Sequence, residues 1–566
     1  MDLKRTVTNT WRETLFVSLQ PVFLFSGIVI LIALILVHIL RGGAPFSHTM
    51  IILALGLGCL AGVLILAGLL AGTAGGMKLM ARLAGIPAGE AMQLRQGGAR
   101  QVWQGILISL LFVTVFFAFL DEKLAVFHLD ATRYYTDTHE YLQVGSYSLG
   151  DIHFWAGLRS FGLPLFYKTV EYNLSNYQDQ GNMNRVSQDQ WNLSVVCWTI
   201  FALAACLALK NWPSRLITFS IILMLSASVD ITFWDRPLLT ESLAISFFVL
   251  LMAMVILGGS FMERARSLPA WAQILAVLAN LLVAVLYAGI RDTNAYFLLF
   301  LGGFMLAGLA FSSLRKAPLL PAYLAIAVGF LAIFWLANSS ANMGKRYVPP
   351  MLHVFAYRFI PEPQSRAYFV SRGMPFDARI ASLDQLTLHE LNSNLVTDPS
   401  ILRLIAWLGQ DGEHLTFQYL VIHPAYFLLA PLQDTQSIVN GTFAVYRLNL
   451  SATPARIRWL SFLTYLRSPW LPLLCLCLAL LSAGLIFKKS NRGRIIWIVV
   501  VSLFLTAYPL AVLGWHGDTN DIERHSVQVA IQLRLAVWLL LGLLVERGVV
   551  LLRRFMPPRE GQQSEE

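Results

Sequence analysis

Residues 102–120 read VWQGILISLLFVTVFFAFL, an uncharged apolar run that is long enough to cross a bilayer as a helix. The chain then turns polar, and residues 131–141 read ATRYYTDTHEY. Asp137 and Glu140 therefore stand beside His139 shortly after an apolar run has ended. Because an ionisable side chain at a membrane boundary is costly unless it lines a wet cavity, we interpret this segment as part of a functional site. The alternative is a pair of solvated loop carboxylates.

The composition places the chain among the membrane proteins. Of its 566 residues, 57% are hydrophobic and 13% are charged, and apolar runs of membrane length recur along it. The net charge of +10 does not indicate nucleic-acid binding, because Lys and Arg cluster between the apolar runs and form no single basic face. All five cysteines lie inside apolar runs, which argues against a disulfide framework and against a zinc site.

The apolar runs predict an all-α polytopic membrane protein with about twelve transmembrane helices. The run at 216–228 is short, and we keep it because Arg215 and Asp230 bound it. The expected spans are residues 21–40, 50–70, 102–120, 191–209, 216–228, 238–257, 270–288, 295–312, 319–337, 471–487, 495–513 and 527–544.

The clusters of Lys and Arg set the expected orientation of these spans. They fall in alternate connections, so the positive-inside bias places them, and both chain termini, in the cytoplasm. The opposite face then collects acidic and His-bearing polar segments. These outward segments are residues 121–190, 230–237, 291–294, 338–467 and 515–525.

This pattern divides the chain into five expected parts. In chain order they are 1–101, with an N-terminal tail, two additional spans and a cytoplasmic loop; 102–337, a transmembrane core with the first outward loop at 121–190; 338–467, an extracytoplasmic loop domain; 468–546, the C-terminal spans with an outward loop at 514–525; and 547–566, a cytoplasmic tail.

Within the loop domain, residues 417–432 form an apolar run. His423-Pro424 would break a helix there, and no basic cluster flanks the run to place it as a span. We therefore favour an interfacial helix that lies on the outer leaflet. A dip into the membrane is the alternative.

Three further outward segments carry candidate site residues. Glu241 opens a span shortly after Pro237, where it is either a second site acid or a residue that caps the helix. Arg291 runs against the positive-inside bias, so it is expected to neutralise a phosphate or a carboxylate, with a local pair to Asp292 as the alternative. Residues 516–525 read HGDTNDIERH, which favours a phosphate or sugar site over a zinc site, since no His pair has the i,i+4 spacing. We expect all four patches to line one cavity.

The arrangement resembles the GT-C type glycosyltransferases, polytopic membrane enzymes that use polyprenyl-phosphate sugars as donors. Three motifs carry the resemblance: TDTHEY at 136–141, RPLLTE at 236–241 and GDTNDIERH at 517–525. It covers the chain from about residue 112 to the final span, so the first two spans are additional. The resemblance implies a multi-pass protein of a bacterial inner (plasma) membrane with its active site on the extracytoplasmic face.

The resemblance also implies roles for individual residues. Asp137 would be the general base, Glu140 or Glu241 a second acid, and Arg524 and His525 would face the lipid phosphate. One displacement at the anomeric carbon would invert its configuration.

Positive charge is needed at the leaving phosphate, from basic side chains or from a divalent cation. Because the chain has Asp137-x-x-Glu140 instead of an adjacent acidic pair, a metal site formed by Asp137, His139 and Glu140 is left open. The residues expected to bind the donor phosphate or sugar are Arg291, Lys345, Arg346, Asp518, Glu523, Arg524 and His525.

The expected partners are a polyprenyl-phosphate sugar donor, a glycan, lipid or protein acceptor, and membrane lipids, with no nucleic acid. Two other functions use similar substrates: a lipid-linked oligosaccharide transporter or flippase, and an O-antigen-type polymerase or ligase. A transporter would favour ionisable residues near the middle of its spans, whereas the polar groups here lie at span ends. The early acid Asp137 favours the glycosyltransferase over the polymerase or ligase.

Overall fold

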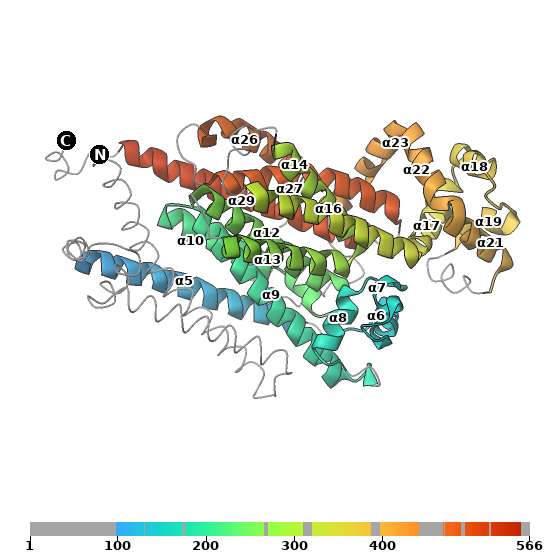
Figure 1. Ribbon diagram of the computed structural model, residues 1–566, viewed down its shortest axis with the longest axis horizontal. Coiled ribbons are helices and arrows are strands. Elements are labelled where there is room, and N and C mark those ends of the chain that lie inside the picture. The colour runs from blue at the N-terminus through green and yellow to red at the C-terminus, as the bar shows by residue number, and fades with distance from the viewer. Residues whose placement is uncertain are drawn as a thin grey trace. The chain divides into compact units, whose positions relative to one another are not determined.

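The computed structural model describes residues 98–129, 131–172, 176–264, 270–309, 320–386, 397–440, 468, 470–487, 493–519 and 522–555. Helices dominate these ranges, which contain no β-strand (Figure 1). The chain divides into two compact units, residues 1–121 with 169–171 and residues 122–168 with 172–566. Every candidate site residue belongs to the second unit.

Six helices within the described residues are long and apolar enough to cross a membrane, and up to eight spans result if each of two bent helix pairs is one span. The predicted all-α, multi-pass membrane class is therefore confirmed. The count of twelve is not: the predicted spans 21–40 and 50–70 lie outside the described residues, and the predicted spans 102–120, 295–312 and 471–487 are not among the six long helices or the two bent pairs. The six helices are α9 (Gln180–Ala208), α12 (Thr240–Arg264), α13 (Ala270–Ile290), α16 (Leu320–Met343), α27 (Arg494–Gly517) and α29 (Val527–Phe555).

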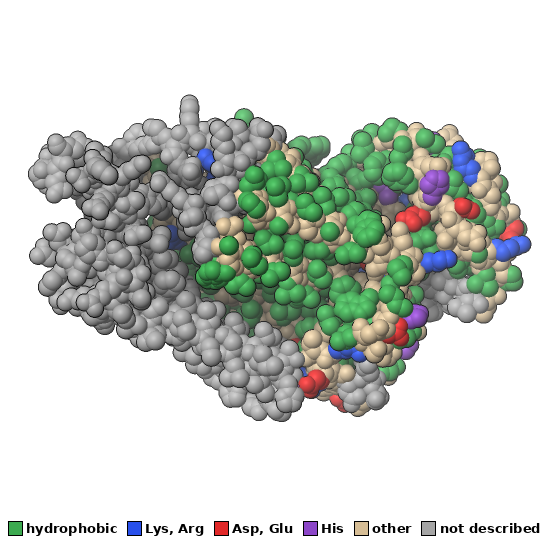
Figure 2. Space-filling view, in the orientation of Figure 1, with side chains coloured by type: hydrophobic (Ala, Val, Ile, Leu, Met, Phe, Trp, Pro, Cys, Tyr) green, Lys and Arg blue, Asp and Glu red, His purple; other side chains and the backbone are tan. Residues whose placement is uncertain are grey.

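These helices form a bundle in which α9 packs along α12 and α27 packs along α29, while α14 (Asp292–Gly308) packs along α16. Helices α13 and α16 keep most of their apolar surface exposed, as Figure 2 shows in the broad green area over the bundle. Exposed apolar side chains on a long helix are suited to hydrocarbon. Charged and histidine side chains are visible toward the right of the same view, among the described residues.

One bent pair joins α10 (Trp212–Ala227) to the segment Val229–Asp235 at an angle of 54°. The break frees backbone carbonyls, which need other donors. Lys123 of α5 (Gly98–Phe127) donates to the carbonyl oxygen of Ser226 at 3.2 Å, and its Nζ lies 3.1 Å from the Asp235 carboxylate. A fully buried lysine therefore satisfies polar groups at the break between α10 and the segment that precedes α12.

The first predicted outward loop folds into α6 (Thr136–Ser146), α7 (Ile152–Ala156) and α8 (Gly162–Thr169). The backbone of Leu238, two residues before the start of α12, holds this loop in place. The Leu238 carbonyl accepts hydrogen bonds of 3.0 Å from Thr138 of α6 and from Tyr167 of α8. Both ends of the loop are thereby held against the start of a membrane helix.

The close approach of α8 to α13 depends on glycine. A Cβ atom built on Gly162 would lie 2.7 Å from the carbonyl oxygen of Gly289 and 2.7 Å from the Ile290 side chain. Next to it, the Ser160 hydroxyl donates to the Ile290 carbonyl at 2.7 Å. This contact places the α7–α8 connection beside the start of α14.

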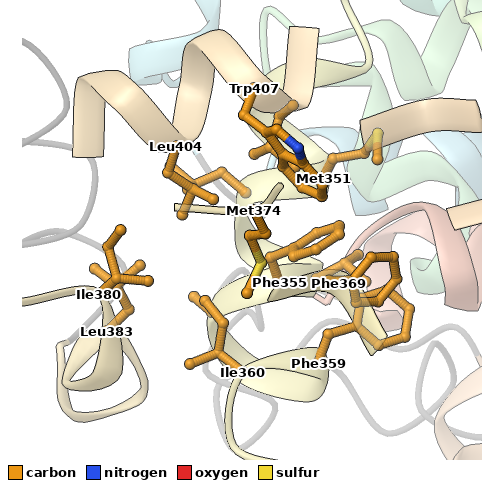
Figure 3. Close-up of a cluster of buried hydrophobic side chains, with 14 of the residues drawn as sticks. Met351, Phe355, Phe359, Ile360, Phe369, Met374, Ile380, Leu383, Leu404 and Trp407 are labelled. Carbon is orange, nitrogen blue, oxygen red and sulfur yellow. The ribbon is translucent and has the colours of Figure 1, made fainter. Parts of the chain in front are cut away.

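The predicted loop domain, where it is described, is helical and has its own hydrophobic core (Figure 3). Phe355, Phe359 and Phe369 pack against one another at ring-centroid distances of 4.7 to 5.1 Å, and Trp407 covers one side. The elements are α17 (Val348–Val354), η3 (Phe355–Phe359), α18 (Pro363–Val370), α19 (Ala378–Ala381), η4 (Leu383–Gln385), α21 (Pro399–Trp407), η5 (Leu408–Gly412), α22 (Glu413–Ile422), α23 (Pro424–Leu429), η6 (Ala430–Asp434) and α24 (Thr435–Asn440).

Candidate functional site

Two carboxylates of α6 share one arginine. Asp137 lies in the first turn of α6 and Glu140 one turn later, so both side chains project from the same face. Arg159, in the connection between α7 and α8, has its Nη2 3.2 Å from Asp137 Oδ1 and its Nε 2.5 Å from Glu140 Oε2. The sequence analysis missed Arg159, although an arginine on the predicted outward side is the signal that singled out Arg291.

A second arginine joins α6 to the membrane bundle. Arg524 lies in α28 (Ile522–His525), immediately before α29. Its Nη1 lies 2.8 Å from Asp137 Oδ2 and its Nε lies 2.5 Å from Glu241 Oε1. The Glu241 side chain is fully buried in the first turn of α12, so Arg524 brings the predicted base and the predicted second acid into one network.

A third arginine extends the network to α14. Arg291 precedes α14, and its Nη1 lies 3.4 Å from Glu241 Oε1. Its Nη2 lies 3.0 Å from Nδ1 of His525, a ring nitrogen that can accept a hydrogen bond when it carries no proton. The opposite ring nitrogen of His525 lies 3.2 Å from Asp518 Oδ2. The structure therefore brings side chains from the four predicted outward segments into one network of contacts.

Asp518 connects this network to the loop domain. Its other oxygen, Oδ1, lies 3.3 Å from Nδ1 of His353 in α17. Burial alone would raise the pKa of the Asp518 carboxyl, but hydrogen bonds from His353 and His525 reverse this and hold the pKa well below its usual range. The sequence analysis did not single out His353, because nothing near it in the sequence distinguishes it from other loop histidines.

Without Asp518, the part of the network that the arginines hold has equal numbers of negative and positive groups. Three carboxylates (Asp137, Glu140, Glu241) face three guanidinium groups (Arg159, Arg291, Arg524). Burial alone would raise the pKa of the Asp137 carboxyl, but Arg524 and Arg159 together hold it below its ordinary value of 3.8. Asp137 is therefore ionised at neutral pH, as a general base must be, and its two partners limit its basicity.

A small pocket opens next to the arginines. Its free volume is about 10 Å³, which is room for about one water molecule. The ion pairs thus leave no open cavity of ligand size beside this pocket, where the sequence analysis expected the four patches to line one. Polar and apolar side chains line it: Glu241, Ala244, Ile245, Arg291, Thr293, Asn294, His525, Val527 and Gln528.

Three predicted phosphate-binding residues are engaged elsewhere. Arg346 forms two contacts of 2.9 Å with the carboxylate of Asp292, so this aspartate has a partner other than its neighbour Arg291. Lys345 is exposed and lies beside Gly409 in the loop domain. Glu523 accepts a 3.5 Å hydrogen bond from Ser437 of α24.

The arrangement does not fit a divalent cation bound by Asp137, His139 and Glu140. Both carboxylates bind Arg159, whereas the His139 ring lies 6.2 Å from the Tyr177 ring, centroid to centroid. Across the described ranges, no group of three or more His, Cys, Asp or Glu side chains is placed to hold a metal ion.

The site can neutralise an anion and accept a proton. Arg291 and His525 line the pocket. Arg524 does not line it, but pairs with the pocket residue Glu241 and with Asp137. In sequence comparisons, no protein-family model matches this chain and no curated protein is similar to it.

Proposed function

We propose that the chain is a GT-C type membrane glycosyltransferase that moves a sugar from a polyprenyl-phosphate donor to a glycan, lipid or protein acceptor. We place the site on the extracytoplasmic face of a bacterial inner membrane, with both chain termini in the cytoplasm. The observation that carries the proposal is the sharing of Arg524 between Asp137 and the buried Glu241, beside Arg291 and His525.

In this proposal the arginines receive the donor phosphate. A guanidinium binds phosphate oxygens through two parallel N–H groups, and it is more weakly hydrated than an ammonium group, which suits a site next to hydrocarbon. Arg524 and Arg291 are both held by the pocket residue Glu241, which fixes their positions before a substrate arrives. The apolar pocket residues Ile245 and Val527 would meet the lipid side of the donor.

Arrival of the phosphate also changes Asp137. A phosphate that draws Arg524 away removes one of the two positive charges that lower the Asp137 pKa, so the carboxylate becomes a stronger base. The acceptor hydroxyl then attacks the anomeric carbon and its proton passes to Asp137. The bond between that carbon and the phosphate oxygen breaks with inversion, and polyprenyl phosphate leaves without needing a proton.

The test is Asp137→Asn in purified full-length protein, assayed in liposomes by release of polyprenyl phosphate from polyprenyl-phosphate sugars. Loss of a general base lowers turnover by roughly 10²- to 10⁴-fold. The matched control is Asp151→Asn, in the same loop, where the carboxylate caps α7 and pairs with His153. Wild-type turnover in the control together with turnover within a few-fold of wild type in Asp137→Asn would remove the proposed base.

A further inference from the structure

The second bent helix pair lies in the loop domain and is unusually apolar for a loop. It joins Pro399–Ile422 to Pro424–Asn440 at an angle of 95°, with the predicted break at His423. Between residues 415 and 433 the chain has no Asp, Glu, Lys or Arg. A water-exposed surface segment of this length normally carries charges, so its environment needs an explanation.

Large apolar side chains project outward on both arms of this bend. Phe417 is 67% exposed and Leu429 is 59% exposed, and Figure 2 shows hydrophobic side chains covering the region of α22 and α23 at the upper right. We call the exposed apolar side chains of the two arms the apolar patch, which consists of Phe417, Val421, Ile422, Leu428, Leu429 and Leu432. The hydrophobic core of the loop domain uses other residues, such as Tyr419 and Leu420 of the same helix.

Hydrogen bonds place α23 beside the end of α27. The His516 ring donates to the Phe427 carbonyl at 2.9 Å, and the Tyr508 hydroxyl donates to the Leu428 carbonyl. Tyr508 lies about 13 Å along the helix from the end at Gly517. The adjacent Phe427 and Leu428 carbonyls of α23 therefore lie against about the last three turns of α27, at a level between His516 and Tyr508.

A second contact places Asn440 of α24 beside α29, also within a few turns of the end of a membrane helix. Arg534 donates to the carbonyl oxygen of Asn440 at 2.8 Å, and its side chain is only 2% exposed. Arg534 lies about 10 Å into α29 from its start at Val527. Asp230, at 3.6 Å, partly balances its charge. A buried arginine inside a membrane helix is costly unless polar groups meet it, and here the Asn440 carbonyl and the Asp230 carboxylate do so.

We propose that α22, α23 and α24 form a re-entrant segment, which enters the leaflet on the Asp137 side of the membrane and whose apolar patch contacts lipid chains. Irregular backbone at membrane depth is stable only where protein groups satisfy it, and Tyr508, His516 and Arg534 do so here. The proposal replaces the interfacial helix favoured from the sequence with the membrane dip, which the 95° bend makes possible.

The segment also touches the elements that hold the site. Asp434 accepts a 2.7 Å hydrogen bond from Trp515, and α24 packs against α28, which carries Arg524 and His525. The proposal does not depend on the transferase activity, because it concerns only where these helices lie.

The test uses full-length protein in liposomes, with native cysteines replaced and one cysteine introduced at a time. A bimane label at Leu429→Cys is compared with labels at Leu282→Cys on α13, which is 61% exposed, and at Arg403→Cys, whose side chain is 66% exposed in the loop domain. Brominated phospholipids are expected to quench the 429 and 282 labels strongly and the 403 label weakly. A water-soluble iodide quencher should show the reverse order.

A label at position 429 that iodide quenches as well as the label at 403 would overturn the proposal. So would a 429 label that neither quencher reaches, because this result would mean that protein covers the patch. Val421→Cys provides a second labelling site on the other arm of the bend, where the native side chain is 58% exposed. Its label should follow the 429 label, since both arms face lipid in the proposed arrangement.

Discussion

Replacing Arg524 tests how the network is held together. Arg524→Gln removes the guanidinium group that lies 2.8 Å from Asp137 and 2.5 Å from Glu241. Asp137 keeps Arg159 and is about one-third exposed, so water can compensate for part of its loss. Glu241 is fully buried and keeps only the 3.4 Å contact with Arg291. The destabilisation therefore arises mainly at Glu241.

The magnitude follows from this burial. Breaking a buried ion pair by removing one partner destabilises a protein by about 3–5 kcal/mol, because the remaining charge is left uncompensated. An exposed pair contributes roughly 0–1 kcal/mol. The matched control is Arg403→Gln, since Arg403 pairs with Asp377 at 2.9 Å but is two-thirds exposed. We expect a large loss of stability in the first variant and almost none in the second.

A double-mutant cycle separates this explanation from general damage to the fold. Unfolding is followed in mixed micelles for Arg524→Gln, Glu241→Gln and the double variant. If the cost is an uncompensated buried charge, the double variant should recover about 2 kcal/mol or more relative to the sum of the single variants. Additive losses, or a loss in Arg403→Gln equal to that in Arg524→Gln, would refute the reasoning.

Two further variants test the electrostatics and the packing of the same site. Arg159→Gln removes a positive charge that lowers the Asp137 pKa, so the pKa of this carboxyl should rise. The acidic limb of the profile of kcat/KM against pH should then move to higher pH. An unmoved limb would contradict the assignment of Asp137 as base. Gly162→Ala places a Cβ atom 2.7 Å from backbone atoms of α13 and should lower the stability by about 1–3 kcal/mol. Gly258→Ala is the control, because no atom lies within 4 Å of its new Cβ atom, and it should not lower the stability. Equal thermal stability of the two variants would argue against a tight α8–α13 contact.

The membrane class and the meeting of the outward segments could be predicted from the sequence, because apolar length and the Lys and Arg bias are long-range signals that need no tertiary detail. These signals placed Asp137, Glu241, Arg291 and Arg524 on one predicted face of the membrane. The structure brings the four side chains into contact. The resemblance to GT-C glycosyltransferases, and the roles it assigns, stay predictions.

The partners of individual charges could not be predicted in the same way. Asp292 follows Arg291 directly, yet it binds Arg346, since neighbouring residues at a helix start point in different directions. Arg159 reaches Asp137 from the α7–α8 connection, whose close contact with α13 at Gly162 is a tertiary feature. The bend at His423 was visible in the sequence, but its 95° angle and the contacts of the bent pair with α27 and α29 were not, because both are tertiary features.

The fate of a polyprenyl-phosphate sugar in liposomes that contain the purified chain tests the central claim most directly. Mass spectrometry of both halves of the donor, with the anomeric configuration of the product determined by NMR, is expected to show free polyprenyl phosphate and a transferred sugar of inverted configuration. Donor that crosses the bilayer intact, with no bond broken, would contradict the account and identify a transporter instead.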